Sequence, residues 1–108
     1  PDVFVVPTAE LRLSVETTRT RGSVAGWRRI TRLFLAAEVL SPSTESDDRT
    51  IRRPLYLERG TPLVWLLDPD TRTAEVWTPG ATEPVLERER LVWHPEGAAR
   101  PCETALDW

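Results

Sequence analysis

The sequence contains no lysine, since all 14 of its basic residues are arginines. A catalytic lysine is therefore excluded, whereas arginine keeps its charge at any ordinary pH and suits bidentate contacts with phosphate. A GC-rich coding bias would also remove lysine, so the absence alone indicates no function. The net charge of −3 gives no overall basic character of the kind common among DNA-binding proteins. Arginine is nevertheless concentrated in residues 1–60, which hold ten arginines against eight acidic residues.

Cysteine and histidine occur once each, as Cys102 and His94. A single cysteine excludes an intrachain disulfide, and no histidine lies close to it in sequence to activate it. We interpret Cys102 as an incidental residue and His94 as an ordinary surface histidine. Long apolar runs are also missing: no run of 18 apolar residues occurs, and the first residues are not those expected of a signal peptide. We therefore expect a cytoplasmic protein that does not enter a membrane.

The length of 108 residues fits one domain with a modest core. We expect a single domain over residues 1–108, and its opening apolar run suggests that a preceding segment is missing. Short apolar runs predict buried strands, and alternating or flanking patterns predict further strands. The predicted strands cover residues 2–6, 33–40, 63–68, 73–78, 85–86 and 91–93.

The remaining segments are predicted to be loops and one helix. Residues 8–26 predict a loop with at most a short strand, and residues 27–33 predict a helical turn. The polar residues 41–48 predict a helix over about 47–59, ended by Gly60. Pro54 should kink this helix or shift its start. Strands followed by one helix and more strands indicate an α/β (α+β mixed) fold with a mixed β-sheet.

Two acidic residues stand out within the predicted strands. Asp2 heads the first strand, and Glu38 lies inside an apolar one. A buried carboxylate is costly unless it is paired or bound to a metal. Together with the Val39 carbonyl, these two carboxylates would offer the oxygen ligands that Mg²⁺ prefers, and such a metal activates water toward a phosphodiester. The alternative is that Glu38 pairs with Arg52 or Arg53 and is purely structural.

Several strings follow one another along the chain in a recognisable order. They are Pro1-Asp2, Glu38-Val39-Leu40-Ser41-Pro42-Ser43-Thr44, Asp48-Arg49, Tyr56, Gly60-Thr61-Pro62 and Trp65-Leu66-Leu67-Asp68-Pro69. Together they resemble the Uma-two family of bacterial restriction endonucleases, which is similar to the PD-(D/E)XK nucleases. The resemblance extends from the first residue to about residue 93. It implies a restriction-endonuclease-like fold, a mixed sheet flanked by helices.

The same resemblance implies which residues are catalytic. Asp2 and Glu38 would be the two acids of the motif and would hold Mg²⁺ (or Mn²⁺) with the Val39 carbonyl. The usual lysine position, two residues after the second acid, is Leu40 here. The family commonly moves that lysine into the following helix, where this chain has Arg52. Arginine stabilises developing negative charge but is a poor general base.

DNA is the substrate that the resemblance implies, with contacts expected from basic and loop residues. The expected DNA-binding residues are Arg28, Arg29, Ser41, Ser43 and Arg49. Arg28 and Arg29 belong to a basic and aromatic cluster. Such a cluster can stack on bases and contact phosphates, although it also fits a solvated helix face. For the two serines, capping the following helix is the favoured alternative role. Tyr56 is expected to face the core rather than the site.

Two functions therefore remain open from the sequence. The first is a metal-dependent endonuclease domain, which the retained Asp2 and Glu38 favour. The second is a catalytically degenerate domain that binds DNA or a protein, which the arginine at position 52 favours. The resemblance implies a further acid in an N-terminal helix, and we expect its position to fall before the first residue of this sequence. Nucleases of this kind often pair to cut both strands, so a homodimer is a possible assembly.

Overall fold

A computed structural model of the chain describes residues 3–6, 8–22 and 32–108. Three of the candidate residues, Asp2, Arg28 and Arg29, lie outside these ranges. Within them, no helix has the length and apolar character needed to cross a membrane. In chain order the elements are β1 (Val3–Val5), α1 (Thr8–Arg21), β2 (Leu35–Val39), α3 (Glu45–Asp47), η1 (Asp48–Arg52), α4 (Arg53–Glu58), β3 (Val64–Asp68), β4 (Thr73–Trp77), β5 (Val85–Glu87), β6 (Arg90–Trp93) and β7 (Cys102–Ala105).

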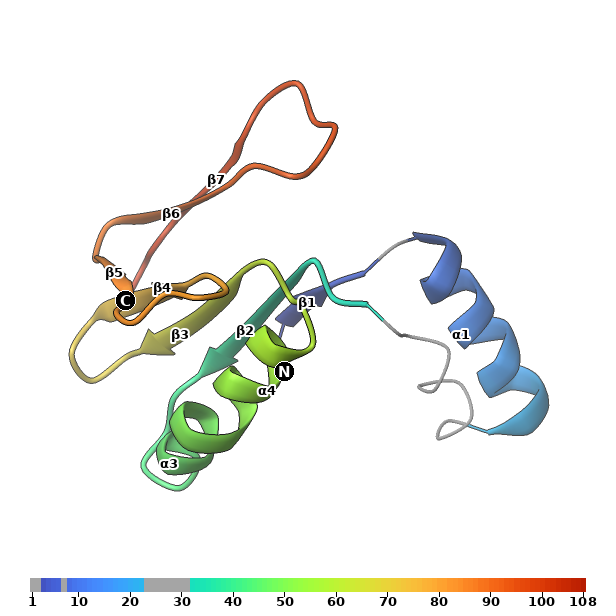
Figure 1. Cartoon of the computed structure of the whole chain (residues 1–108), viewed down its shortest axis with the longest axis horizontal. Coiled ribbons are helices and arrows are strands. Elements are labelled where there is room, and N and C mark those ends of the chain that lie inside the picture. Colours follow the sequence, from blue (N-terminus) through green and yellow to red (C-terminus); the bar gives the residue numbers. More distant parts are fainter. Residues whose placement is uncertain (1–2, 7, 23–31) are drawn as a thin grey trace.

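Five strands form one mixed sheet in the order β1-β2-β3-β4-β5. The β2 and β3 strands are parallel, and the other neighbours are antiparallel. A parallel pair needs a crossover connection, and the helical run of α3, η1 and α4 supplies it. Figure 1 shows this run along one face of the sheet, with α1 beyond β1 and the β6–β7 hairpin beyond β5. The predicted α+β fold with a mixed sheet is confirmed.

The strands of the sheet follow the apolar runs closely. Predicted strands at 33–40, 63–68 and 73–78 are present as β2, β3 and β4, and the short edge strands are present as β5 and β6. One strand was missed. The tail rich in proline and glycine predicted no strand, but Cys102–Ala105 pairs with β6 in a separate two-stranded sheet. Its partner, and not its composition, makes this segment extended.

The prediction of a loop over residues 8–26 is wrong, because α1 occupies most of that segment. Threonine, frequent here, has a low helix propensity and led to the loop prediction. The charges at the two ends favour a helix instead: Glu10 lies in the first turn and Arg21 in the last, so both complement the helix dipole. Gly22 follows with φ +99°, the left-handed conformation in which many helices end.

The helix predicted over about 47–59 is present as the continuous run of α3, η1 and α4, and Gly60 ends it with φ +87°. Pro54 lies in the first turn of α4 and is preceded by the π-helical η1. There the Arg53 amide donates to the carbonyl of Asp48, five residues earlier. The wider π turn lets the helix continue through a proline that cannot donate a hydrogen bond. Pro54 therefore does not end the helix; the backbone hydrogen bonds just before it change from the α-helical to the π-helical pattern.

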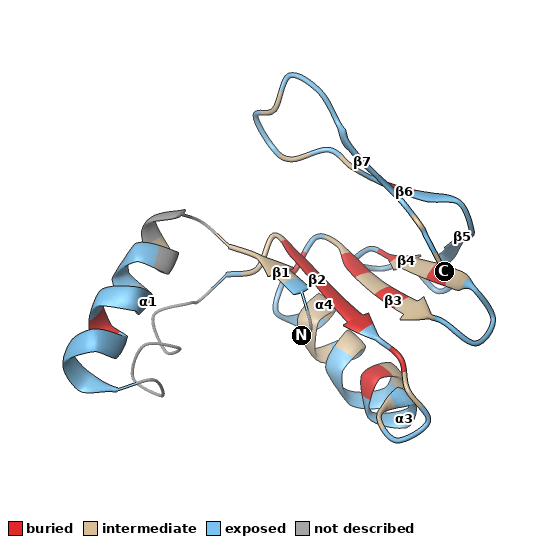
Figure 2. Cartoon of the chain, turned by 180° about the vertical axis from the view of Figure 1, so that it is seen from behind, coloured by how far each residue is buried: buried red, intermediate tan, exposed pale blue. Residues whose placement is uncertain are grey.

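The core lies between the sheet and this helical run. Leu66 and Val64 of β3 are fully buried and pack with Leu40, while Tyr56 and Leu57 of α4 pack against them. The burial colours in Figure 2 show the same concentration on β2 and β3. The helical run is thus held on the sheet by apolar contacts that centre on β3.

Truncation of Leu66 tests the position of the core. Leu66 is 0% exposed, so Leu66→Ala removes buried apolar contacts and leaves a cavity. We expect the free energy of unfolding to fall by about 2–5 kcal/mol, measured by urea denaturation followed by circular dichroism. The matched control is Leu86→Ala, because Leu86 is 60% exposed. Equal effects of the two substitutions would contradict this core.

Candidate functional site

Glu38 is a carboxylate in the middle of the apolar strand β2, and it is 2% exposed. Its register partner on β3 is Leu66, whose partner on β4 is Glu75. Directly paired residues point to the same face of a sheet, so these three side chains form one row across three strands. The row lies under the helical run, because Tyr56 of α4 and Arg49 of η1 both bond to its carboxylates.

Two helical residues contact the Glu38 carboxylate, and a third, Asp48, bonds to one of them. The Tyr56 hydroxyl donates a hydrogen bond to Oε1 of Glu38 at 2.8 Å. Nη1 of Arg52 lies 3.9 Å from Oε2 of Glu38 and donates to Oδ1 of Asp48 at 3.1 Å. Asp48 is itself 1% exposed. The site thus brings two buried carboxylates, one guanidinium and one phenol together.

The charges of this cluster explain how two carboxylates can be buried around one arginine. A buried carboxylate without a partner is strongly disfavoured, and here both carboxylates contact the same cation. The hydrogen bond to Asp48, followed by the charge of Glu38, raises the pKa of Arg52 above its usual value. Burial, followed by the hydrogen bond and charge of Glu38, raises the pKa of Tyr56 well above its usual value. Arg52 therefore stays charged and Tyr56 stays neutral.

A second ion-pair network joins the same helix to β4. Arg49 contacts Glu75, and its Nε donates to Glu45 at 3.1 Å. Burial works against the charge of Arg49, but its bonds to the two carboxylates outweigh this and raise its pKa. Glu75 also accepts a hydrogen bond of 3.0 Å from the Trp77 indole. The helix carrying Arg52 is thereby fixed to β4 as well as to β2.

Of the two arginines predicted as structural partners of Glu38, only Arg52 is near it in the described structure. The Arg53 guanidinium instead lies over the Trp77 ring, 3.9 Å from its centroid. Val39, whose carbonyl was predicted as a metal ligand, follows Glu38 at the end of β2. The resemblance alone assigned a catalytic role to position 52, and Arg52 lies beside Glu38, the carboxylate that the same resemblance assigned to the active site.

The loop serines lie just before the helical run. The Ser41 hydroxyl lies 2.8 Å from that of Thr44 and 3.2 Å from that of Ser43, within hydrogen-bonding distance of both. Thr44 occupies the cap position of α3 and makes no side-chain capping hydrogen bond. The hydroxyls thus bond to one another within the loop. Whether they contact DNA stays a prediction, as it does for Arg49.

The sequence prediction missed the part that Tyr56 plays, because a core-facing tyrosine was expected. The ring does pack on the core, yet its hydroxyl reaches Glu38. Asp48, Arg52 and Tyr56 follow one another at intervals of four residues, which places them on one face of a helix. That spacing, combined with an acidic residue in the preceding strand, is the signal that would have found the cluster.

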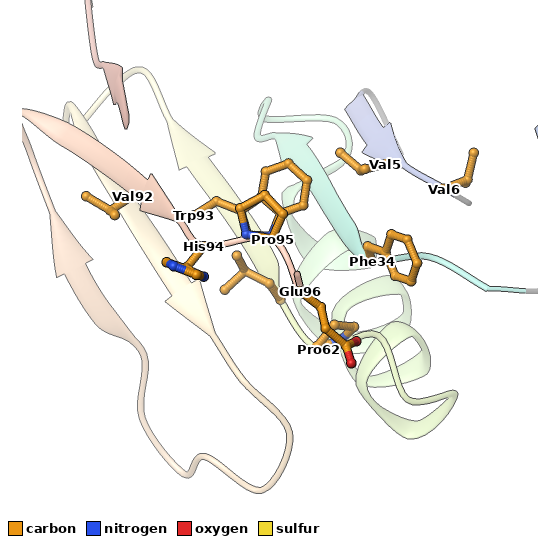
Figure 3. A pocket seen from close by; sticks show the side chains of 10 residues that line it. Val5, Val6, Phe34, Pro62, Val92, Trp93, His94, Pro95 and Glu96 are labelled. Atoms are coloured by element: carbon orange, nitrogen blue, oxygen red, sulfur yellow. The ribbon is translucent and has the colours of Figure 1, made fainter. Parts of the chain in front are cut away.

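A separate open cavity of about 710 Å³ lies between the β6–β7 hairpin and the sheet. Phe34, Leu63 and Trp93 contribute to its apolar walls, and His94 and Glu96 line it as well (Figure 3). Glu38 is not among its lining residues. His94, predicted as a surface histidine, is exposed. The cavity and the carboxylate cluster are therefore distinct.

Comparisons with known proteins agree with the motifs. A family model named Uma2 and described as "Putative restriction endonuclease" matches residues 1–104. A solved structure of "a putative nuclease belonging to DUF820" from Anabaena variabilis ATCC 29413 is 30% identical, with a TM-score of 0.48. That match covers 59% of this chain and 35% of the other, so it spans about a third of the solved protein. No curated protein matches the chain.

The raised pKa of Tyr56 can be measured directly, because it is the only tyrosine in the chain. With ¹³Cζ-labelled tyrosine, NMR should show the phenol still protonated at about pH 10, the ordinary pKa of tyrosine. Above that pH the unfolded chain loses a proton that the folded chain keeps, so the stability of the fold should decrease as the pH rises. The control is the same titration in urea. Ionisation near pH 10 in the folded state would contradict the contact with Glu38.

Proposed function

The chain belongs to the Uma2 family, whose model, described as "Putative restriction endonuclease", matches residues 1–104, and from this premise we propose that it is a metal-dependent endonuclease domain acting on DNA phosphodiester bonds. The observation that carries the proposal is the buried Glu38 carboxylate with the Arg52 guanidinium 3.9 Å from its Oε2. A metal-ligating acid next to a fixed positive charge is what phosphodiester hydrolysis needs. We propose that it acts in the cytoplasm.

The donor atoms fit a hard divalent cation. Glu38 offers carboxylate oxygens and Val39 a backbone carbonyl, the oxygen ligands that Mg²⁺ and Mn²⁺ accept. Among the residues that the structure describes, no three acidic, histidine or cysteine side chains are placed so that together they could hold a metal ion. Mg²⁺ needs only one or two carboxylates, because it keeps several waters and binds substrate phosphates. Asp2 is the second proposed carboxylate, since it precedes Val3, which pairs with Ala37 next to Glu38.

When bound, the cation would polarise the phosphodiester and lower the pKa of a water nucleophile. The protein residues contribute positioning and charge. Arg52 is 47% exposed in its side chain, so its guanidinium is accessible to a phosphate while one nitrogen stays with Asp48. There it would stabilise the negative charge that builds up on the phosphoryl oxygens. Arg52 keeps its proton, so deprotonation of the water is not assigned to it.

DNA contacts are proposed on the side of the helical run and the loop before it. Ser41 and Ser43 are candidates there, and Arg28 and Arg29 are candidates outside the described residues. Arg49 would exchange one carboxylate for a phosphate, and Glu45 is the partner it can release, with 48% of its side chain exposed against 14% for Glu75. Two such domains would pair to cut both strands of a duplex.

A second candidate function is a nuclease-like domain that binds DNA or protein without cleavage. The observation that favours it is the pairing of Arg52 with both buried carboxylates. In that arrangement the guanidinium already neutralises Glu38 and Asp48, so the cluster is stable without a divalent cation. The two candidates differ in whether Glu38 binds a metal.

Metal binding by Glu38 is the first test. Titration of the full chain with Mn²⁺ by calorimetry should show binding that Glu38→Gln reduces at least about tenfold, because one ligand is lost. The matched control is Glu58→Gln, which removes an exposed carboxylate from α4. Cleavage of supercoiled plasmid DNA should likewise be reduced in Glu38→Gln and retained in Glu58→Gln. A folded wild-type chain that binds no Mn²⁺ would exclude the endonuclease and favour the binding domain.

Restoring a lysine at position 52 tests the assignment of that residue. Lysine can lose its proton when partly desolvated, so Arg52→Lys adds a possible general base. We expect faster plasmid cleavage, by about 100-fold if proton transfer limits the rate. Arg53→Lys is the control, because Arg53 lies over Trp77 and not beside Glu38. An unchanged rate in Arg52→Lys, with folding intact, would speak against position 52 as the lysine site.

A further inference from the structure

We propose that Tyr56 is a positioning residue of the candidate active site, and that its hydroxyl fixes the orientation of the Glu38 carboxylate for binding a divalent cation. This inference rests on the proposed function. It begins from the different environments of the two Glu38 oxygens. Oε1 accepts a hydrogen bond from the phenol at 2.8 Å, whereas Oε2 faces the Arg52 guanidinium at 3.9 Å.

A carboxylate needs such a partner if it is to bind a metal in one orientation. The last torsion of a glutamate side chain is broad and roughly two-fold, so packing alone does not fix which oxygen faces the metal. A hydrogen bond of 2.8 Å to Oε1 fixes that torsion and directs Oε2 to the side of Arg52. Partners behind a metal ligand set its orientation and its affinity in the same way.

The chemistry of a phenol suits this task better than that of a cation. Tyr56 donates one hydrogen bond and carries no charge, so it orients Glu38 without neutralising it. A second arginine in its place would compete with a divalent cation for the carboxylate. On its other side the Glu38 carboxylate faces the Arg52 guanidinium, so Tyr56 adds orientation but no second positive charge.

Tyr56 can fix Glu38 because its own ring is fixed. The ring packs against the buried cluster that includes Val64 and Leu66. Its backbone carbonyl accepts a hydrogen bond of 2.9 Å from Thr61, just beyond the end of α4. Apolar packing on one side and the helix end on the other leave the hydroxyl in one place. The orientation of Glu38 is therefore set by the core through Tyr56.

The experiment compares Tyr56→Phe with the wild type in the full chain. Phenylalanine keeps the ring and its packing and removes only the hydroxyl. The matched control is Thr50→Val, which removes an exposed hydroxyl that bonds only to a backbone carbonyl of the same helical run. Mn²⁺ affinity is measured by calorimetry, plasmid cleavage gives kcat and KM separately, and thermal unfolding gives Tm.

We expect Tyr56→Phe to bind Mn²⁺ about 10- to 100-fold more weakly, the range typical when a partner of a metal ligand is lost. The same variant should lower kcat at saturating Mn²⁺ while KM for DNA stays unchanged, because no DNA contact is removed. Thr50→Val should match the wild type in every measurement. A purely structural Tyr56 would instead lower Tm alone.

The outcomes separate this inference from the proposed function. If the wild type binds Mn²⁺ and cleaves DNA, and Tyr56→Phe does both equally well within about twofold, the positioning role is overturned and the endonuclease stands. Should the wild type neither bind Mn²⁺ nor cleave, the endonuclease itself is overturned and the positioning role with it. Weaker Mn²⁺ binding by a folded Tyr56→Phe chain supports both, with or without a lower Tm, because loss of a hydrogen bond to a buried carboxylate also costs stability.

Discussion

The burial of Glu38 is the constraint on which the rest of the site depends. A carboxylate that is 2% exposed within a sheet requires polar partners within reach, and the helical run of α3, η1 and α4 supplies two of them. That run therefore carries both Tyr56 and Arg52 toward β2. The apolar contacts around Leu66 hold the run in place, so the geometry of the site depends on the packing of the core.

The π turn at η1 connects this arrangement to the sequence. Pro54 would disrupt a regular helix, and the hydrogen bond from Arg53 to Asp48 widens the turn just before it. The helix thereby continues through the proline with Arg52 on one side of it and Tyr56 on the other. Both residues then reach the same carboxylate from a single helix. A helix that ended at Pro54 would separate the phenol from the guanidinium.

Much of this architecture is readable from the sequence, for a physical reason. Short apolar runs form buried strands because their side chains must leave water, so β2, β3 and β4 were predicted within about two residues of their ends. The α1 helix was missed because threonine-rich segments have weak local preferences, and β7 because pairing with β6 makes it a strand. Such elements depend on context that propensity does not contain.

The same limit applies to the site. The acidic residue in an apolar strand pointed to Glu38, because an unpartnered buried charge is costly. Composition could not tell which of two neighbouring arginines would reach it, and the structure divides them: Arg52 lies beside Glu38 and Arg53 lies over Trp77. The two arginines differ because of their positions on the helix. Asp48, Arg52 and Tyr56 are spaced four residues apart and share one face, whereas Arg53, the next residue, points to a different side of the helix. Charge chemistry selected the carboxylate, and helical periodicity selected its partners.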